Sequence, residues 1–119
     1  MKKDFEKYLK SVVQEYIPIL LLERYTFDYK KGTSNPHALM ECKFNYPYLN
    51  ATILYNDDVI NRWKNGQNVK PIIIYELCHI ITDPFYAKAM GRFSGADEIE
   101  AERELLTDYI CNIVVKNNL

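Results

Sequence analysis

The sequence has 119 residues, a length that suits one domain with its own hydrophobic core, so we predict a single domain over residues 1–119. Apolar residues make up 48% and charged residues 26%, which is ordinary for a globular protein. The formal net charge of -1 gives no global electrostatic case for binding nucleic acid or a membrane, and neither is expected as a partner.

The cysteines and the apolar runs bear on the cellular compartment. Cys42, Cys78 and Cys111 are widely spaced and odd in number, which argues against a disulfide framework, and no CxxC pair indicates a zinc knuckle. The N-terminal stretch MKKDFEKYLK lacks the apolar centre of a signal peptide. The longest apolar runs are far shorter than the ~20 residues that a membrane span needs. We therefore expect a cytoplasmic protein with buried free thiols.

The first half of the chain predicts a helix followed by a sheet. Apolar residues from Phe5 to Tyr16 recur at helical spacing, and Pro18 favours a helix end close to Tyr16. Three later segments alternate apolar and polar residues instead, which is typical of half-buried strands. These segments are 25–29, 40–46 and 49–55, and we predict that they form an antiparallel meander.

The second half returns to the helical period. Asn56 or Asp57 is expected to cap a short helix that Gly66 ends. Asn68 is expected to cap the next helix, which should end near Asp83 because Pro84 discourages continuation.

A loop with two glycines then leads to a long final helix capped by Asp97. The predicted order is helix, sheet, two helices, loop, helix. This order defines an α+β fold.

The helix predicted over Val69–Asp83 is apolar around most of its girth and is therefore expected to be buried. At about 100° per residue, Glu76, His79 and Asp83 share one face, with Tyr75 at its margin. A buried carboxylate must be paired, hydrogen-bonded or metal-bound, because desolvating a lone charge is costly. This face is therefore the candidate functional face.

The final helix offers carboxylates that could meet this face. Glu102 falls near the middle of the predicted apolar stripe and Glu98 lies at its edge, whereas Glu104 is expected to point to solvent. The structural alternative is that Glu102 pairs with Arg92 or Arg103. The stripe itself comprises Ile99, Leu105, Leu106, Tyr109, Ile110 and Ile113.

Tyr75–Phe85, with the sequence YELCHIITDPF, resembles the HELxHxxTDPL-type active helix of small zincin-like proteins, many of them encoded by phages or prophages. These are distantly similar to the ImmA/IrrE-type metallopeptidases. The resemblance begins at the strand LNATILY, which starts at Leu49, continues through Glu98–Arg103 and covers roughly 49–115. It implies a minimal zincin-like fold with a buried active-site helix and a long C-terminal helix.

The resemblance also implies roles for single residues. Glu76 would be the general base, His79 the second histidine ligand of a zinc ion, and Glu98 or Glu102 the downstream carboxylate ligand. Tyr75 stands where the family has its first histidine, and a neutral phenol is a poor zinc ligand. Asp83, one turn after His79, is a candidate replacement ligand in an oxygen-rich site.

Three functional hypotheses follow. The first is a degenerate zincin-like domain, a pseudoenzyme that acts by binding another protein, and the loss of the first histidine favours it. The second is a metal-dependent hydrolase, most naturally a peptidase, with an altered ligand set. The third is a structural polar core in which Tyr75, Glu76, His79 and Glu102 are hydrogen-bonded to one another. The sequence leaves all three open.

Overall fold

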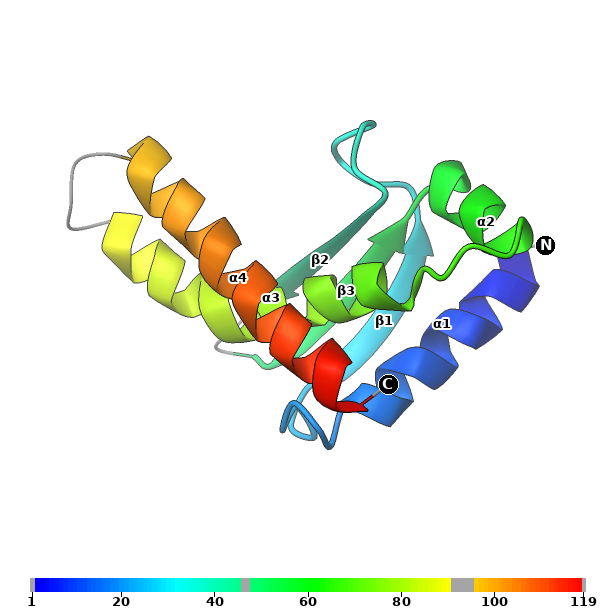
Figure 1. The fold of residues 1–119 in the computed structure, drawn as a ribbon, viewed down its shortest axis with the longest axis horizontal. Coiled ribbons are helices and arrows are strands. Elements are labelled where there is room, and N and C mark those ends of the chain that lie inside the picture. The colour runs from blue at the N-terminus through cyan, green and yellow to red at the C-terminus, as the bar shows by residue number, and fades with distance from the viewer. Residues whose placement is uncertain (1, 46–47, 91–95, 119) are drawn as a thin grey trace.

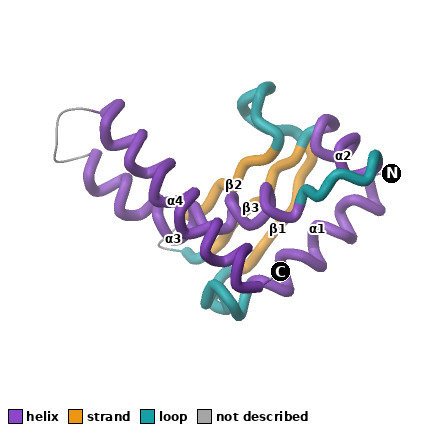
Figure 2. Tube along the Cα trace, in the orientation of Figure 1, coloured by secondary structure: helices purple, strands orange, loops and turns teal. Residues whose placement is uncertain are grey.

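The computed structural model describes residues 2–45, 48–90 and 96–118, and it has four helices and one three-stranded sheet in those ranges (Figures 1 and 2). Helix α3 packs against α1, β2 and α4, and α2 follows the central strand of the sheet. The α+β class is confirmed. The elements are α1 (Lys2–Tyr16), β1 (Thr26–Lys31), β2 (Met40–Asn45), β3 (Asn50–Tyr55), α2 (Asp57–Lys64), α3 (Lys70–Met90) and α4 (Ala96–Asn118).

The sheet is mixed, with the strand order β1-β3-β2, so the predicted antiparallel meander is wrong. β3 lies in the centre, parallel to β1 and antiparallel to β2. Its position follows from its composition, because Ala51, Ile53, Leu54 and Tyr55 are buried whereas β1 and β2 alternate with exposed residues. The most apolar strand takes the place where both of its edges are hydrogen-bonded.

The core gathers side chains from both halves of the chain. Phe5, Leu9 and Val13 of α1 are fully buried together with Ile73 and Leu77 of α3. The prediction that the middle of α3 is buried is therefore confirmed. In the part of the chain that the structure describes, no helix is long and apolar enough to cross a membrane.

The caps of α2 and α3 follow the predicted chemistry, whereas the predicted cap of the final helix is wrong, because α4 begins at Ala96 and Asp97 lies inside its first turn. The Asn56 side chain accepts a hydrogen bond from the backbone N–H of Val59 at the start of α2, and Asn68 accepts one from Lys70 at the start of α3. Gly66, with φ of 85°, terminates α2. The predicted loop glycines and Arg92 lie outside the described residues.

Helix α3 does not end near Asp83 as predicted but continues through Pro84 to Met90. A proline inside a helix removes one backbone hydrogen bond, and tertiary packing has to compensate for this loss. The compensation comes from α4, which runs beside the second half of α3 (Figure 1). Thr82 and Thr107 are both buried at this contact, and their hydroxyl oxygens are 2.8 Å apart.

The turn that follows α1 ends at Leu21, whose backbone has a left-handed conformation. The N–H of Leu22 donates to the carbonyl of Ile17, and the N–H of Leu21 donates to that of Pro18. This is the Schellman arrangement, in which the left-handed position usually carries glycine. Leu21 fills that position with φ of 58°, and its side chain is 80% exposed.

We expect Leu21→Gly to raise the free energy of unfolding by about 0.5–1 kcal/mol, because it relieves the left-handed strain and removes little packing. Urea unfolding measures the change. Gly66→Ala is the matched control, since Gly66 holds the equivalent position after α2, where Gln67 N–H donates to the carbonyl of Arg62. The control should lose stability. A loss in Leu21→Gly as well would contradict the prediction.

Candidate functional site

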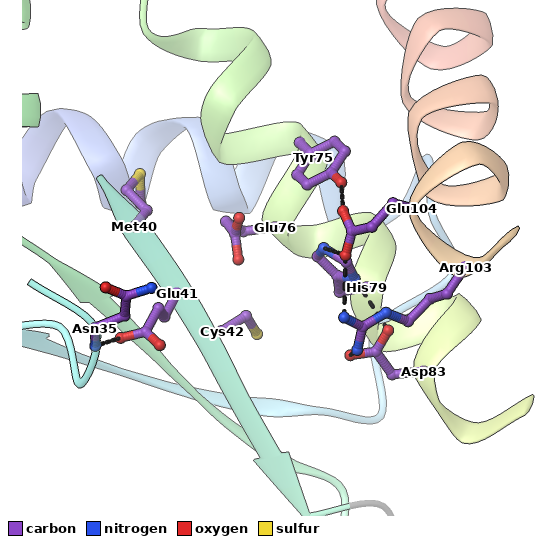
Figure 3. Close-up of a pocket in the computed structure, with 10 residues that line it drawn as sticks. All are labelled: Asn35, Met40, Glu41, Cys42, Tyr75, Glu76, His79, Asp83, Arg103 and Glu104. Atoms are coloured by element: carbon purple, nitrogen blue, oxygen red, sulfur yellow. Dashed lines mark hydrogen bonds and ion pairs between the residues drawn. The ribbon is translucent and has the colours of Figure 1, made fainter. Parts of the chain in front are cut away.

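A cavity of about 380 Å³ opens between strand β2 and the two long helices (Figure 3). The candidate face of α3 lines it, so the prediction that Glu76, His79 and Asp83 share one face with Tyr75 at its margin is confirmed. On the other side lie β2, an edge strand of the sheet, and the loop before it. The remaining lining residues are Asn35, Met40, Glu41, Cys42, Arg103 and Glu104.

Tyr75 and His79 lie one helical turn apart and touch each other. Their ring centroids are 4.9 Å apart and the rings are nearly perpendicular. The Tyr75 hydroxyl donates a hydrogen bond to Oε2 of Glu104. Nδ1 of His79 is 2.9 Å from Oδ1 of Asp83, and Nε2 is 4.0 Å from Oε1 of Glu104. The imidazole is therefore placed between two carboxylates.

The last helix does bring a carboxylate to His79, but it is Glu104 rather than either of the predicted residues. Glu98 and Glu102 are exposed and do not line the cavity, so the placement of Glu102 in a core-facing stripe is wrong. Glu104 follows Glu102 by two positions, which turns it roughly 160° around the helix axis. The true inner face of α4 carries Arg103, Thr107, Ile110, Cys111 and Val114.

Arg103 adds a positive charge beside Tyr75, His79, Asp83 and Glu104. The structural alternative paired it with Glu102, but its guanidinium pairs with other carboxylates. Its Nη2 is 3.1 Å from Oε1 of Glu104, and its Nη1 is 3.8 Å from Oδ2 of Asp83. Its guanidinium also lies over the Tyr86 ring, 4.0 Å from the centroid, and Nη2 is 3.6 Å from Glu100. The guanidinium thus joins two carboxylates from two different helices (Figure 3).

The carboxylates around His79 favour its charged form. Burial alone would lower the pKa of the imidazole, but the hydrogen bond to Asp83 and the charges of Asp83, Glu76 and Glu104 act in the opposite direction. The net result is a pKa above the ordinary 6.5. His79 therefore acts as a second cation of the cluster at mildly acidic pH.

Glu76 lines the cavity with a carboxyl group whose pKa is strongly raised. Burial raises its pKa from 4.5 to about 7, although the charge of His79 and the backbone N–H of Cys42 lower it and the nearby Glu104 and Asp83 raise it further. In Figure 3 its side chain points toward β2, away from the cluster that holds Arg103. A carboxyl group with this pKa exchanges protons near neutral pH, which is the property of a general acid or base.

The Tyr75 phenol is held in its neutral form. Burial, the hydrogen bond to Glu104 and the nearby negative charges raise its pKa well above the ordinary 10.0. A metal ligand at this position would have to be a phenolate. The surroundings of Tyr75 therefore oppose the ionisation that metal binding by this side chain requires.

The residues present do not fit a zinc ion. The cluster supplies one imidazole, His79, whose Nδ1 already pairs with Asp83. The two carboxylates that face it share the fixed guanidinium of Arg103, which takes the place of a metal cation between them. Within residues 2–45, 48–90 and 96–118, no group of three or more His, Cys, Asp or Glu side chains is arranged to hold a metal ion.

Comparison of the chain with protein-family models, with curated proteins and with solved structures finds no match.

Sequence reasoning found the α3 half of the site and missed the α4 half. The sequence predicts Arg103 only as a partner of Glu102 and predicts that Glu104 points to solvent. The spacing of Arg103, Thr107, Ile110 and Val114 is itself helical and could have identified the inner face. This signal is weak because two of the four side chains are polar, whereas the competing stripe is rich in leucine and isoleucine.

Proposed function

We propose that this chain is a degenerate zincin-like domain that acts in the cytoplasm by binding another protein and carries out no hydrolysis. One observation supports the loss of chemistry above the others: Arg103 joins Asp83 and Glu104 beside His79, so a fixed side-chain cation neutralises the carboxylates that would otherwise attract a metal ion. Tyr75 at the first-histidine position, hydrogen-bonded to Glu104, supports the same conclusion.

The cavity and the strand beside it suit a protein partner. β2 is an edge strand, and Met40, Glu41 and Cys42 bring it to the cavity wall. Edge strands bind extended segments of other proteins through backbone hydrogen bonds, with side chains entering neighbouring pockets. Four carboxylates and one guanidinium line this cavity. We therefore expect a partner segment with a basic side chain at its centre.

The alternative is a hydrolase with an altered ligand set, and the pKa of about 7 at Glu76 favours it. Such a group is suited to taking a proton from water at neutral pH. The two functions differ in what purified protein does with zinc and with peptides.

Zinc binding provides the test. The wild-type melting temperature should change by less than about 1 °C on adding Zn²⁺, and peptide cleavage should be absent with or without a chelator. The double variant Tyr75→His/Arg103→Gln restores the second imidazole and removes the fixed cation. Zinc at 100 times its Kd should stabilise this variant by about 2.7 kcal/mol, or roughly 10 °C. Chelator-sensitive peptide cleavage by the wild type would overturn the proposal.

Partner binding has its own test. Asn35 is exposed and lines the cavity, so Asn35→Trp should obstruct the entry of a partner segment and abolish binding of any protein that the wild type captures from cells. Gln14→Trp is the matched control, because it introduces the same side chain at an exposed position of α1. A partner that binds both variants equally would not use the cavity.

A further inference from the structure

The outer face of α4, defined by Leu105, Leu106, Tyr109 and Ile113, is apolar and exposed. These side chains are 64%, 49%, 68% and 48% exposed, respectively. They are four of the seven large hydrophobic side chains that are exposed among the described residues, and they lie within two and a half helical turns. At 3.6 residues per turn, all lie within roughly 60° of the Tyr109 direction.

Three of the four residues of this face, Leu105, Tyr109 and Ile113, are arranged symmetrically about Tyr109. Leu105 lies four positions before Tyr109 and Ile113 lies four positions after it. Glu102 lies seven positions before and Lys116 seven positions after, and both are exposed. Both also fall within roughly 20° of the Tyr109 direction. One end of the face is therefore acidic and the other end basic.

We propose that the outer face of α4 binds the same face of a second copy of this chain, in an antiparallel pair with the two-fold axis at Tyr109. In this arrangement Leu105 contacts the second copy's Ile113, and Glu102 faces the second copy's Lys116. The symmetry repeats both contacts, and the two Tyr109 rings meet on the axis. A two-fold interface requires such a self-complementary surface.

Charge selects the antiparallel orientation. A parallel pair places Glu102 against its own copy and Lys116 against its own copy, and like charges at an interface are repulsive. The antiparallel pair converts both contacts into ion pairs and sets the two helix dipoles in opposite directions. A partner of unrelated sequence has no reason to match this spacing of apolar and charged residues.

The pairing leaves the candidate site open. Arg103 and Glu104 lie on the inner side of α4 and line the cavity, whereas the outer face of α4 points the other way. The dimer therefore does not depend on the proposed function, and each proposal fails or stands by its own experiment. One helix face is a small interface, so we expect a reversible dimer.

Sedimentation equilibrium of the full chain from about 1 μM to 1 mM tests the proposal, in a range that covers weak dimers. The average mass should rise with concentration from that of one chain toward that of two. Tyr109→Glu puts two like charges on the axis and should weaken the dimer by roughly 100-fold or more. A monomer at every wild-type concentration, or a dimer unaffected by Tyr109→Glu, would overturn the proposal.

Charge reversal tests the orientation. Glu102→Lys and Lys116→Glu should each raise the dissociation constant by roughly tenfold, since each replaces two attractive contacts by repulsive ones. The double variant should regain wild-type affinity, and the two single variants, when mixed, should pair with each other. Glu23→Lys makes the same charge change between α1 and β1 and should have no effect. If the double variant stayed as weak as the single variants, the antiparallel pairing would be wrong.

Discussion

Replacing Glu76 with glutamine should raise the free energy of unfolding at pH 8 by about 1–3 kcal/mol. The folded protein holds the Glu76 proton up to a pKa of about 7, whereas an ordinary glutamate releases it near 4.5. This difference corresponds to about 3 kcal/mol of destabilisation above pH 7. Glutamine keeps an oxygen that can accept from the Cys42 N–H and carries no charge to desolvate. The expected gain is less than the full 3 kcal/mol because the glutamine amide adds N–H groups that need acceptors when they are buried.

The same pKa determines how stability depends on pH. The unfavourable contribution of Glu76 is absent below pH 4.5, grows as pH rises toward 7 and stays constant above it. His79 acts in the same direction, because its raised pKa stabilises the fold below pH 6.5 and this stabilisation disappears as pH rises through the folded-state pKa. The wild type should therefore be more stable at pH 5 than at pH 8.

Urea unfolding at pH 5 and pH 8 checks both statements. In Glu76→Gln the fall in stability between these pH values should shrink, and the part that remains should come from His79 and lie above pH 6.5. Glu23→Gln makes the same chemical change at an exposed position and should alter stability by less than about 0.5 kcal/mol at either pH. An equal fall in wild type and Glu76→Gln would show that Glu76 does not titrate in this range.

Leu77→Ala should cost about 2–5 kcal/mol of folding free energy at any pH. Leu77 is 0% exposed and belongs to the cluster that joins α1, the sheet and α3. The loss combines the transfer free energy of the removed methyl and methylene groups with the cavity that they leave. Thermal unfolding should show the melting temperature lowered by roughly 10 °C or more.

Leu105→Ala is the matched control for this change, because it makes the same substitution on α4 at a side chain that is 64% exposed. Its effect on a dilute, monomeric sample should stay within about 0.5 kcal/mol. Similar losses in the two variants would mean that α4 packs with the face predicted from sequence, with Leu105 inside.

The α3 part of the site was predictable because its helix is apolar on every side but one. Ile73, Ile74 and Leu77 fill the core, so the ionisable residues of α3 can occupy one remaining face of the helix. Glu76, His79 and Asp83 were therefore placed together correctly. The caps at Asn56 and Asn68 were also predictable. A side-chain oxygen just before a helical pattern accepts a hydrogen bond from a free backbone N–H of the first turn.

The face of α4 was not predictable by the same reasoning. Four members of its most apolar stripe, Leu105, Leu106, Tyr109 and Ile113, are exposed, whereas its inner face includes Arg103 and Thr107. The Arg103 guanidinium pairs with Asp83 and Glu104, and the Thr107 hydroxyl donates to the backbone carbonyl of Arg103 and lies 2.8 Å from Thr82. Hydrophobic periodicity assigns such polar residues to solvent. Only the tertiary contact shows that each has a partner. The position of Glu104 could not be obtained before that face was known.

The strand order escaped prediction for a different reason. Alternation identifies a strand but does not say which strand is its neighbour, and sequential hairpins are the usual expectation. Here Lys31 at the end of β1 and Met40 at the start of β2 both pair with Tyr55 of β3, on its two sides. The connection 32–39 joins them. It passes over the position that β3 fills later in the sequence.

The central place of β3 has a consequence for the order of folding events. β2 and β3 begin their pairing at Asn45 and Asn50, five residues apart, whereas β1 and β3 pair Thr26 with Asn50 across 24 residues. Closing the longer loop costs about 1.4 kcal/mol more chain entropy. The β2–β3 hairpin should thus nucleate the sheet, and β1 should dock on it afterwards. β1 is then also the strand that detaches at the lowest free energy, and its amides should exchange with solvent before those of β3.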